Sequence, residues 1–191
     1  VISQNLDFGV AFDGDADRSV FIDDKGNLIS GSLMTCLISD WLFEKKSEIK
    51  VVHNVNVQPS VVKYLNDKGI KTIRSKVGHS YIKKIMRDKD ADFGGEHSAH
   101  FYLRENFYAD SGILTLLIFL KILTEKNVKS SVLLENYEFN PSSGEINYMV
   151  EDVETSLKKI ENSFEGEFDK LDGISYFSDD FWFNVRGSNT E

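Results

Sequence analysis

Three aspartates stand at alternate positions directly after the first apolar stretch of the chain. That stretch, residues 7–12 (DFGVAF), is typical of a buried strand, and Asp13, Asp15 and Asp17 follow it at once. Their carboxylates converge when such a loop curls, and carboxylate oxygens are ligands that Mg²⁺ prefers. Without a cation, the repulsion between three close carboxylates would be costly. The spacing therefore predicts a magnesium site. Arg18 offsets part of this charge or reaches a substrate phosphate.

Three other interpretations of this acidic loop stay open. A solvated acidic turn is the ordinary one, although here the loop adjoins a predicted buried strand. An EF-hand calcium loop needs a glycine where Arg18 stands, and helices rather than strands on either side. A phosphatase of the haloacid-dehalogenase class also begins with a strand and Asp-x-Asp, but usually has Thr or Val where this chain has Asp17.

A second chemically capable loop is the segment KVGHS, between a predicted strand and a predicted helix. Gly78 permits close approach of a ligand to the backbone, and the start of a helix favours an anion. Lys76 and His79 add hydrogen-bond donors. The segment therefore indicates a phosphate or sugar contact.

A third loop, GGEHSAH, also follows a predicted strand. Glu96 and Ser98 suit hydrogen bonding to vicinal sugar hydroxyls, and His100 can act as an acid or base near neutral pH. A single such residue would more often be structural. Three of the chain's 4 histidines lie in these two loops, however, and the carboxyl ends of parallel strands meet at one edge of a sheet. We expect one shared cleft.

The last polar segment has the composition of a phosphate-binding loop. Arg186, Ser188, Asn189 and Thr190 surround Gly187, which allows a tight turn. An ordinary polar chain end is the alternative. We expect residues 186–191 to be frayed.

The elements that position these loops alternate between strands and helices. This alternation predicts an α/β fold with a parallel or mixed sheet, right-handed crossovers and flanking helices, with Ser32 as the N-cap of the first helix. The pattern breaks near residues 140–144, and beyond this boundary we expect a small C-terminal α+β domain. The predicted strands are 7–12, 19–23, 50–55, 70–74, 91–94, 145–150, 174–177 and 181–185, with a hairpin turn at 24–27, and the predicted helices begin near residues 32, 59, 80, 110, 128 and 152.

Composition narrows the possible partners. The 191 residues carry a net charge of −9, which makes a nucleic-acid partner a poor hypothesis. Cys36 is the single cysteine, so an intrachain disulfide is excluded, and a cytoplasmic location is expected. The longest apolar run, 113–120, is too short to span a bilayer, so no membrane association is expected. The absence of an initial Met suggests a fragment.

Taken together and in this order, the motifs resemble those of the α-D-phosphohexomutase family. The matching segments are DGDADR (13–18), KVGH (76–79), GEHSAH (95–100) and RGSNTE (186–191). The resemblance implies three parts: the end of a metal-loop domain (1–24), an α/β sugar-recognition domain (25–140) and a truncated phosphate-binding domain (141–191). N-terminal domains of the same protein would then be partners of this chain.

The resemblance also implies a reaction. A phosphoserine outside these residues would donate its phosphoryl group, and a hexose bisphosphate would form, turn around and return the other phosphate. The substrate would be mannose 6-phosphate or mannose 1-phosphate, with glucose or glucosamine phosphates as alternatives. Asp13, Asp15 and Asp17 would hold Mg²⁺, while Arg18 would orient the phosphoryl group and His100 would carry a proton.

The implied substrate contacts come from the other three segments. Glu96 and Ser98 would read sugar hydroxyls in both orientations of the sugar, and His79 would line the sugar site. The full set of implied substrate-binding residues is Lys76, Gly78, His79, Glu96, Ser98, Arg186, Ser188, Asn189 and Thr190.

Three features depart from the family pattern. There is no Ser-His-Asn-Pro-like serine loop, so we expect this chain alone to be inactive, and a non-catalytic binder of metal and sugar phosphate stays an alternative. Asn56 stands where relatives often carry Lys or Arg, and His97 where Met is common.

Overall fold

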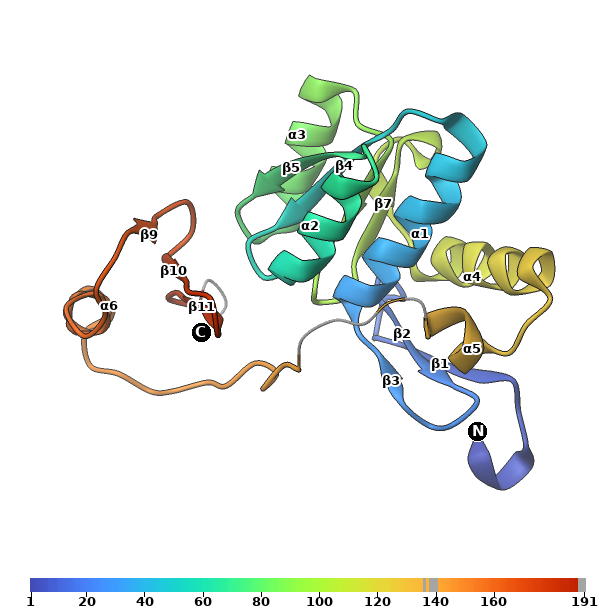
Figure 1. The fold of residues 1–191 in the computed structure, drawn as a ribbon, viewed down its shortest axis with the longest axis horizontal. Coiled ribbons are helices and arrows are strands. Elements are labelled where there is room, and N and C mark those ends of the chain that lie inside the picture. The colour runs from blue at the N-terminus through green and yellow to red at the C-terminus, as the bar shows by residue number, and fades with distance from the viewer. Residues whose placement is uncertain (136, 138–140, 189–191) are drawn as a thin grey trace. The chain divides into compact units, whose positions relative to one another are not determined.

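The computed structural model describes residues 1–135, 137 and 141–188 (Figure 1). The chain forms two compact units, residues 1–140 and 141–191. The first 24 residues lie within the first unit, and their assignment to a preceding domain stays a prediction. Each unit is described by itself.

The first unit begins with a three-stranded antiparallel sheet of order β1-β2-β3. Phe8 pairs with Asp23 and Phe12 with Ser19, so residues 13–18 form the connection between two paired strands. The predicted hairpin turn is present. The elements are a 3₁₀ turn at Ile2–Gln4, β1 (Phe8–Phe12), β2 (Ser19–Asp23) and β3 (Leu28–Ile29).

A five-stranded mixed sheet of order β5-β4-β6-β7-β8 forms the centre of the unit (Figure 1). Strands β5, β4 and β6 are parallel, whereas β7 and β8 are antiparallel additions. The chain leaves β4 toward β5 on one side and leaves β6 toward β7 on the other, so the connections diverge at the carboxyl ends of β4 and β6, where open α/β sheets bind ligands. The strands are β4 (Lys50–Asn54), β5 (Lys71–Ser75), β6 (Phe93–Gly95), β7 (Phe101–Leu103) and β8 (Ala109–Asp110).

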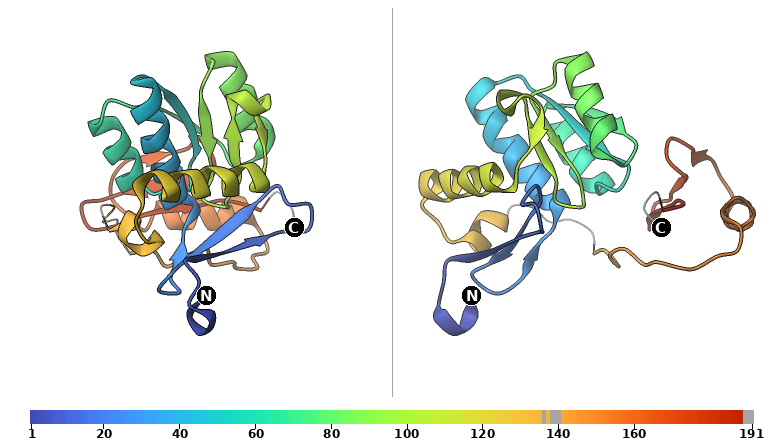
Figure 2. Two further views of the ribbon diagram at one scale, coloured as in Figure 1. Left: turned by 90° about the vertical axis from the view of Figure 1, so that its right-hand side faces the viewer. Right: turned by 180° about the vertical axis from the view of Figure 1, so that it is seen from behind.

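Helices cover both faces of this sheet (Figure 2). Val51 packs in the larger core cluster, with α1 and α2, while the next residue, Val52, packs with Ile82 and Met86 of α3. This alternation follows from the two-residue period of a strand, and it also places Tyr102 on the α3 face. The helices are α1 (Gly31–Lys46), α2 (Pro59–Asp67), α3 (His79–Lys89), α4 (Gly112–Lys126) and α5 (Ser130–Leu134), with a 3₁₀ turn at Arg104–Asn106.

The helix starts near the site are set by serine caps. The Ser30 hydroxyl accepts a hydrogen bond from the Leu33 N–H at 3.2 Å and caps α1, so the prediction of Ser32 as the N-cap is wrong. Ser32 lies within the first turn, where its hydroxyl is 2.9 Å from Nδ1 of His97. The Ser111 hydroxyl caps α4 in the same way, accepting from the Leu114 N–H at 3.2 Å.

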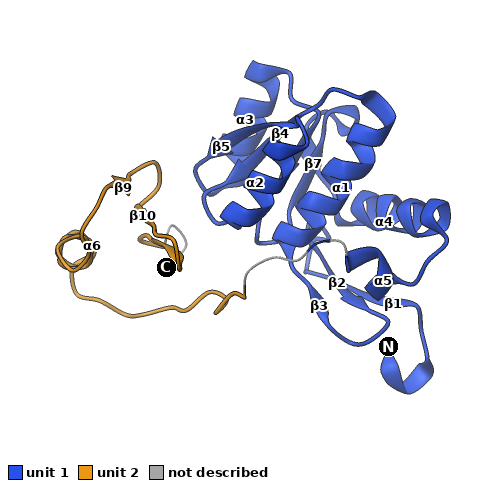
Figure 3. Cartoon of the chain, viewed as in Figure 1, with its two compact units in different colours: residues 1–140 blue, residues 141–191 orange. Residues whose placement is uncertain are grey.

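The second unit is a small α+β arrangement (Figure 3). An antiparallel sheet of order β11-β10-β9 carries a cluster of aromatic rings that includes Phe164, Tyr176 and Phe183. The strand predicted over 145–150 is wrong, because this segment is exposed and irregular and no described strand pairs with it. The elements are α6 (Val153–Glu161), β9 (Phe168–Asp169), β10 (Ile174–Phe177) and β11 (Trp182–Val185). Across the described residues of both units, no helix combines the length and apolarity that crossing a membrane requires.

Candidate active site

The acidic loop curls so that its three carboxylates converge. Asp13, Asp15 and Asp17 each offer an oxygen within 4.8 Å of the others. Arg18 holds the curl, because its backbone N–H donates to Oδ1 of Asp13 at 3.1 Å and its Nε donates to Oδ2 at 2.6 Å. The sequence-predicted metal ligands are therefore together in one loop.

The charges in this loop are not fully balanced. Burial raises the pKa of Asp17, and repulsion from Asp15, Asp13 and Asp110 adds to the increase although His100 opposes it. The buried Oδ1 of Asp17 receives no hydrogen bond from any described residue. Asp13 differs: burial raises its pKa, but its hydrogen bonds and charge interaction with Arg18 outweigh burial and lower it overall. A carboxylate oxygen without a hydrogen bond, beside two further carboxylates, belongs to the kind of donor set that a hard divalent cation fits.

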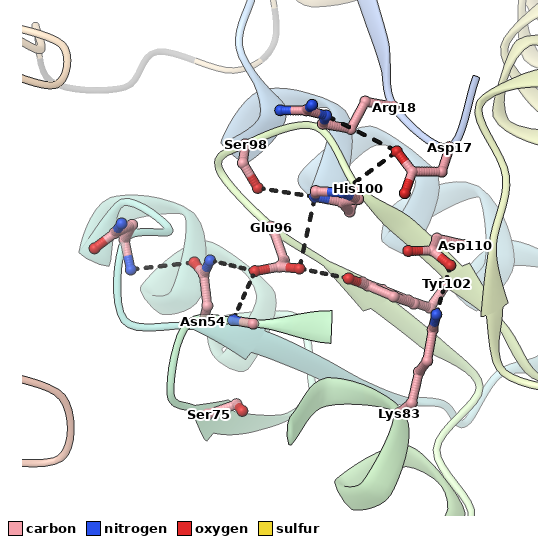
Figure 4. Close-up of polar contacts among 12 residues, drawn as sticks. Asp17, Arg18, Asn54, Ser75, Lys83, Glu96, Ser98, His100, Tyr102 and Asp110 are labelled. Atoms are coloured by element: carbon pink, nitrogen blue, oxygen red, sulfur yellow. Dashed lines mark hydrogen bonds and ion pairs between the residues drawn. The ribbon is translucent and has the colours of Figure 1, made fainter. Parts of the chain in front are cut away.

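Glu96 lies at the divergence point between β4 and β6, and its carboxylate is buried (Figure 4). The side-chain amide of Asn54, the last residue of β4, donates to Oε2 at 2.8 Å. The Tyr102 hydroxyl donates to Oε1 at 2.5 Å. A buried carboxylate is stable only when such donors compensate it, and these come from neighbouring strands.

His100 lies between the acidic loop and Glu96 (Figure 4). Its Nε2 is 3.5 Å from Oδ1 of Asp17, and its Nδ1 is 3.8 Å from Oε1 of Glu96. Its Nδ1 is also 3.1 Å from the exposed Ser98 hydroxyl. One imidazole thus connects the predicted metal ligands to the predicted sugar-reading residues.

The backbones of the two loops are also joined. Arg18 and His100 form an antiparallel β-bridge, and the Ser19 N–H donates to the carbonyl of Ala99 at 3.3 Å. The Gly112 N–H, at the start of α4, donates to the carbonyl of Ala16 at 3.0 Å. The acidic loop is therefore fixed against both the 95–100 loop and a helix start.

Of the predicted KVGH residues, Gly78 contacts Glu96. Its N–H donates to Oε2 at 3.5 Å, and its φ of 125° is a conformation that glycine adopts readily. His79 begins α3 and is exposed. Lys76 is exposed as well, with its ammonium group 5.9 Å from the centroid of the Tyr81 ring.

The predicted phosphate loop belongs to the second unit. Arg186 donates from Nη1 to the carbonyl of Gly187 at 3.3 Å, and Ser188 is exposed. Asn189 and Thr190 lie outside the described residues, and so does half of the segment expected to be frayed, residues 189–191.

Sequence reasoning missed four residues of this cluster, namely Asn54, Lys83, Tyr102 and Asp110. The ammonium group of Lys83 is 2.7 Å from Oδ1 of Asp110 and 5.6 Å from the centroid of the Tyr102 ring. Asp110 also offers an oxygen within 4.8 Å of ligand atoms of Asp17 and His100. The one available signal was Asn54, a polar residue at the carboxyl end of a predicted strand.

The fold and the site together define a doubly wound α/β domain with an acidic loop beside a buried carboxylate. The family model of phosphoglucomutase/phosphomannomutase, alpha/beta/alpha domain III, matches residues 30–139. The chain is 39% identical over 192 residues to a phosphomannomutase of Methanocaldococcus jannaschii, and 36% identical over 195 residues to one of Escherichia coli K12. Both alignments cover 100% of this chain and 43% of the relative.

Solved structures share the fold. A phosphoglucomutase/phosphomannomutase family protein of Burkholderia thailandensis superposes with a TM-score of 0.77 at 23% identity, covering 96% of this chain and 40% of that one. An N-acetylphosphoglucosamine mutase of Aspergillus fumigatus, in complex with GlcNAc-6P and magnesium, gives a TM-score of 0.57 at 16% identity, covering 68% of this chain and 32% of that one. This chain belongs to the phosphoglucomutase/phosphomannomutase family, and it spans less than half the length of the relatives that it matches.

Proposed function

We propose that this chain supplies the metal-binding and sugar-reading part of a phosphohexomutase that interconverts mannose 6-phosphate and mannose 1-phosphate. The observation that carries the proposal is the continuous polar cluster from the acidic loop through His100 to Glu96. Two relatives with which it shares more than a third of its residues are named phosphomannomutases. The Aspergillus mutase, with bound GlcNAc-6P and magnesium, shares the fold.

Asp13, Asp15 and Asp17 are the residues that would hold Mg²⁺. The Oδ1 of Asp17, which receives no hydrogen bond from a described residue, and the convergence of all three carboxylates support this assignment. When bound, the cation would act as a Lewis acid toward the oxygens of the phosphoryl group. Arg18 would orient that group, because its side chain is 47% exposed while its Nε contacts Asp13.

The sugar would be read at the other end of the cluster. Glu96 and Ser98 would form hydrogen bonds with vicinal hydroxyls, and His100 would carry a proton to or from the reacting oxygen. Gly78, Lys76 and His79 would line the same sugar site. In the second unit, Arg186, Ser188, Asn189 and Thr190 would grip the phosphate that is not transferred.

The phosphoryl donor would be a phosphoserine outside these 191 residues. The sequence has no Ser-His-Asn-Pro-like loop. In the cluster from the acidic loop to Glu96, the serine beside a possible general base is Ser98, which contacts His100. This chain by itself would therefore bind metal and sugar phosphate without turnover.

The test is a mutase assay of the complete protein that carries this chain, with Mg²⁺ and a trace of hexose bisphosphate. Mannose 1-phosphate, glucose 1-phosphate and glucosamine 1-phosphate would be compared, and we expect mannose 1-phosphate to give the highest kcat/KM. Asp15→Asn should abolish turnover without unfolding the protein, since Asp15 is exposed.

Three results would redirect the proposal. Faster turnover of a glucose or glucosamine phosphate would reassign the substrate within the same family. A phosphorylated Asp13, trapped during turnover, would favour the phosphatase mechanism. Metal-dependent binding of hexose phosphate without turnover by the complete protein would favour a non-catalytic binder.

A further inference from the structure

The buried carboxylate of Glu96 depends on a tyrosine that no motif includes. Glu96 is 2% exposed and Tyr102 is 0% exposed, so water does not compensate either group. The Tyr102 hydroxyl donates to Oε1, while Asn54 donates to Oε2. The Gly78 N–H also donates to Oε2, so that oxygen has two donors and Oε1 has one. Each carboxylate oxygen has two lone pairs, so the acceptor capacity left for a ligand is on Oε1.

The buried ring of Tyr102 is packed among Gly94, His100 and Lys83. Gly94 pairs with Tyr102 across β6 and β7, and a Cβ at Gly94 would lie 3.1 Å from the ring. The absent side chain therefore makes room for the ring. The His100 ring is stacked at 6.3 Å with an interplanar angle of 20°, and the Lys83 ammonium group lies 5.6 Å from the ring centroid.

A ring held in this way gives its hydroxyl a fixed direction. Burial raises the pKa of Tyr102, and the neighbouring Glu96 carboxylate raises it further. The phenol therefore stays protonated and remains a donor. The donated proton determines which lone pairs of Glu96 stay available.

We propose, on the basis of the proposed function, that Tyr102 is a positioning residue for sugar recognition. Its hydroxyl fixes the Glu96 carboxylate in the orientation in which the remaining lone pair of Oε1 accepts from a sugar hydroxyl. Without the hydroxyl, Oε1 loses its donor and the carboxylate turns away from this orientation. Tyr102 touches no substrate itself and acts through Glu96.

The test is Tyr102→Phe in the complete phosphohexomutase, because this change removes the hydroxyl and keeps the ring. The matched control is Tyr64→Phe, since the Tyr64 hydroxyl donates to the Asp40 carboxylate at 2.7 Å in another part of the unit. We expect KM for the hexose phosphate to rise about tenfold in Tyr102→Phe, with kcat changed by less than about threefold. Tyr64→Phe should leave both constants unchanged.

A double-mutant cycle with Glu96→Gln separates positioning from general destabilisation. If Tyr102 acts through Glu96, the Tyr102→Phe change raises KM in the wild-type background and has little effect in the Glu96→Gln background. Discrimination against a deoxy analogue that lacks one vicinal hydroxyl should also decrease. These readouts do not respond to a loss of stability alone.

The outcomes distinguish the two proposals. An active wild-type protein in which Tyr102→Phe behaves like Tyr64→Phe would overturn the role of Tyr102 and leave the proposed function intact. Additive effects of Tyr102→Phe and Glu96→Gln on KM would also overturn it. A wild-type protein without mutase activity would overturn the proposed function and this inference with it.

Discussion

At the scale of single residues, the carboxylates of the acidic loop lower the stability of the metal-free fold and together suit a cation. Three converging carboxylates repel one another, and Arg18 compensates Asp13 more directly than it compensates Asp17. Asp17 keeps a buried oxygen without a hydrogen bond from the described residues. A carboxylate that is only partly compensated in this way lowers the stability of the fold, and metal binding would offset that loss.

We therefore predict that Asp17→Asn raises the melting temperature of the metal-free protein at pH 7. The pKa of Asp17 is raised above its ordinary value of 3.8, first by burial and then by its acidic neighbours. A raised carboxyl pKa lowers folding stability once the group ionises, so the advantage of the variant is present at pH 7. It shrinks as the pH falls through the raised pKa and is gone near 3.8.

Thermal melts at several pH values, with and without Mg²⁺, measure this effect. Mg²⁺ should stabilise the wild-type protein and leave Asp17→Asn nearly unchanged. Asp179→Asn, at an exposed turn of the second unit, is the matched control and should show neither effect. A lower melting temperature for metal-free Asp17→Asn at pH 7 would contradict the prediction.

At the scale of the elements, close approach of a helix start to the sugar-reading loop fixes the site. Gly31 is the first residue of α1, and a Cβ there would lie 2.4 Å from the carbonyl oxygen of His97 and 2.5 Å from that of Glu96. The neighbouring atoms are backbone and cannot rotate away. Because Gly31 has no side chain, the backbone at Glu96 and His97 can pack directly against the start of α1.

We predict that Gly31→Ala lowers the free energy of unfolding by about 1–3 kcal/mol, the usual cost of overpacking. Helix propensity alone predicts the opposite, a gain of up to about 1 kcal/mol. Urea denaturation distinguishes the two. Gly14→Ala is the control, because a Cβ there meets nothing within 4 Å and should change stability little. A Gly31→Ala protein as stable as the wild type would show that the 96–97 backbone yields.

Elements with several residues of clear periodicity could be predicted, whereas short ones could not. The strands around residues 50–54 and 71–75 and the helix between them have apolar runs and end signals of their own. Strands β7 and β8 have only three and two residues, too few to show a period. Residues 145–150 alternate like a strand, but pairing is a property of the fold and no described strand pairs with them.

The site divides in the same way. Asp13, Asp15 and Asp17 stand at alternate positions of one short loop, so their convergence could be inferred from their spacing. Asn54, Tyr102 and Asp110 meet the cluster from three different strands, and only the order β4-β6-β7-β8 brings these strands side by side. Apart from the place of Asn54 at the carboxyl end of a predicted strand, a single sequence carries no signal for such juxtaposition.

At the scale of the whole chain, two compact units are joined by an exposed segment. Residues 141–150 have no regular secondary structure, and Tyr148 and Met149 are 80% and 96% exposed. An exposed irregular backbone is the preferred substrate of proteases.

We predict that limited chymotrypsin digestion cuts first after Tyr148 and releases the two units. Mass spectrometry of the early fragments identifies the cut. Tyr148→Ala should slow this cleavage, whereas Tyr102→Phe should leave its position unchanged because residue 102 is buried. A first cut within α1–α4 would show that the first unit opens more readily than the connecting segment.

The β-bridge between Arg18 and His100 has a consequence for which ligands fit. One backbone pairing joins the acidic loop to the loop of Glu96. On the proposed function, it therefore fixes the distance between the residues that would bind the phosphoryl group and the residue that would bind the sugar hydroxyls. On the proposed function, a sugar that turns around must present its hydroxyls at this same separation from either phosphate. In a hexose, the hydroxyls near the middle of the carbon chain meet this condition. On the same proposed function, a triose phosphate would be too short, and the site would select its substrate by molecular length.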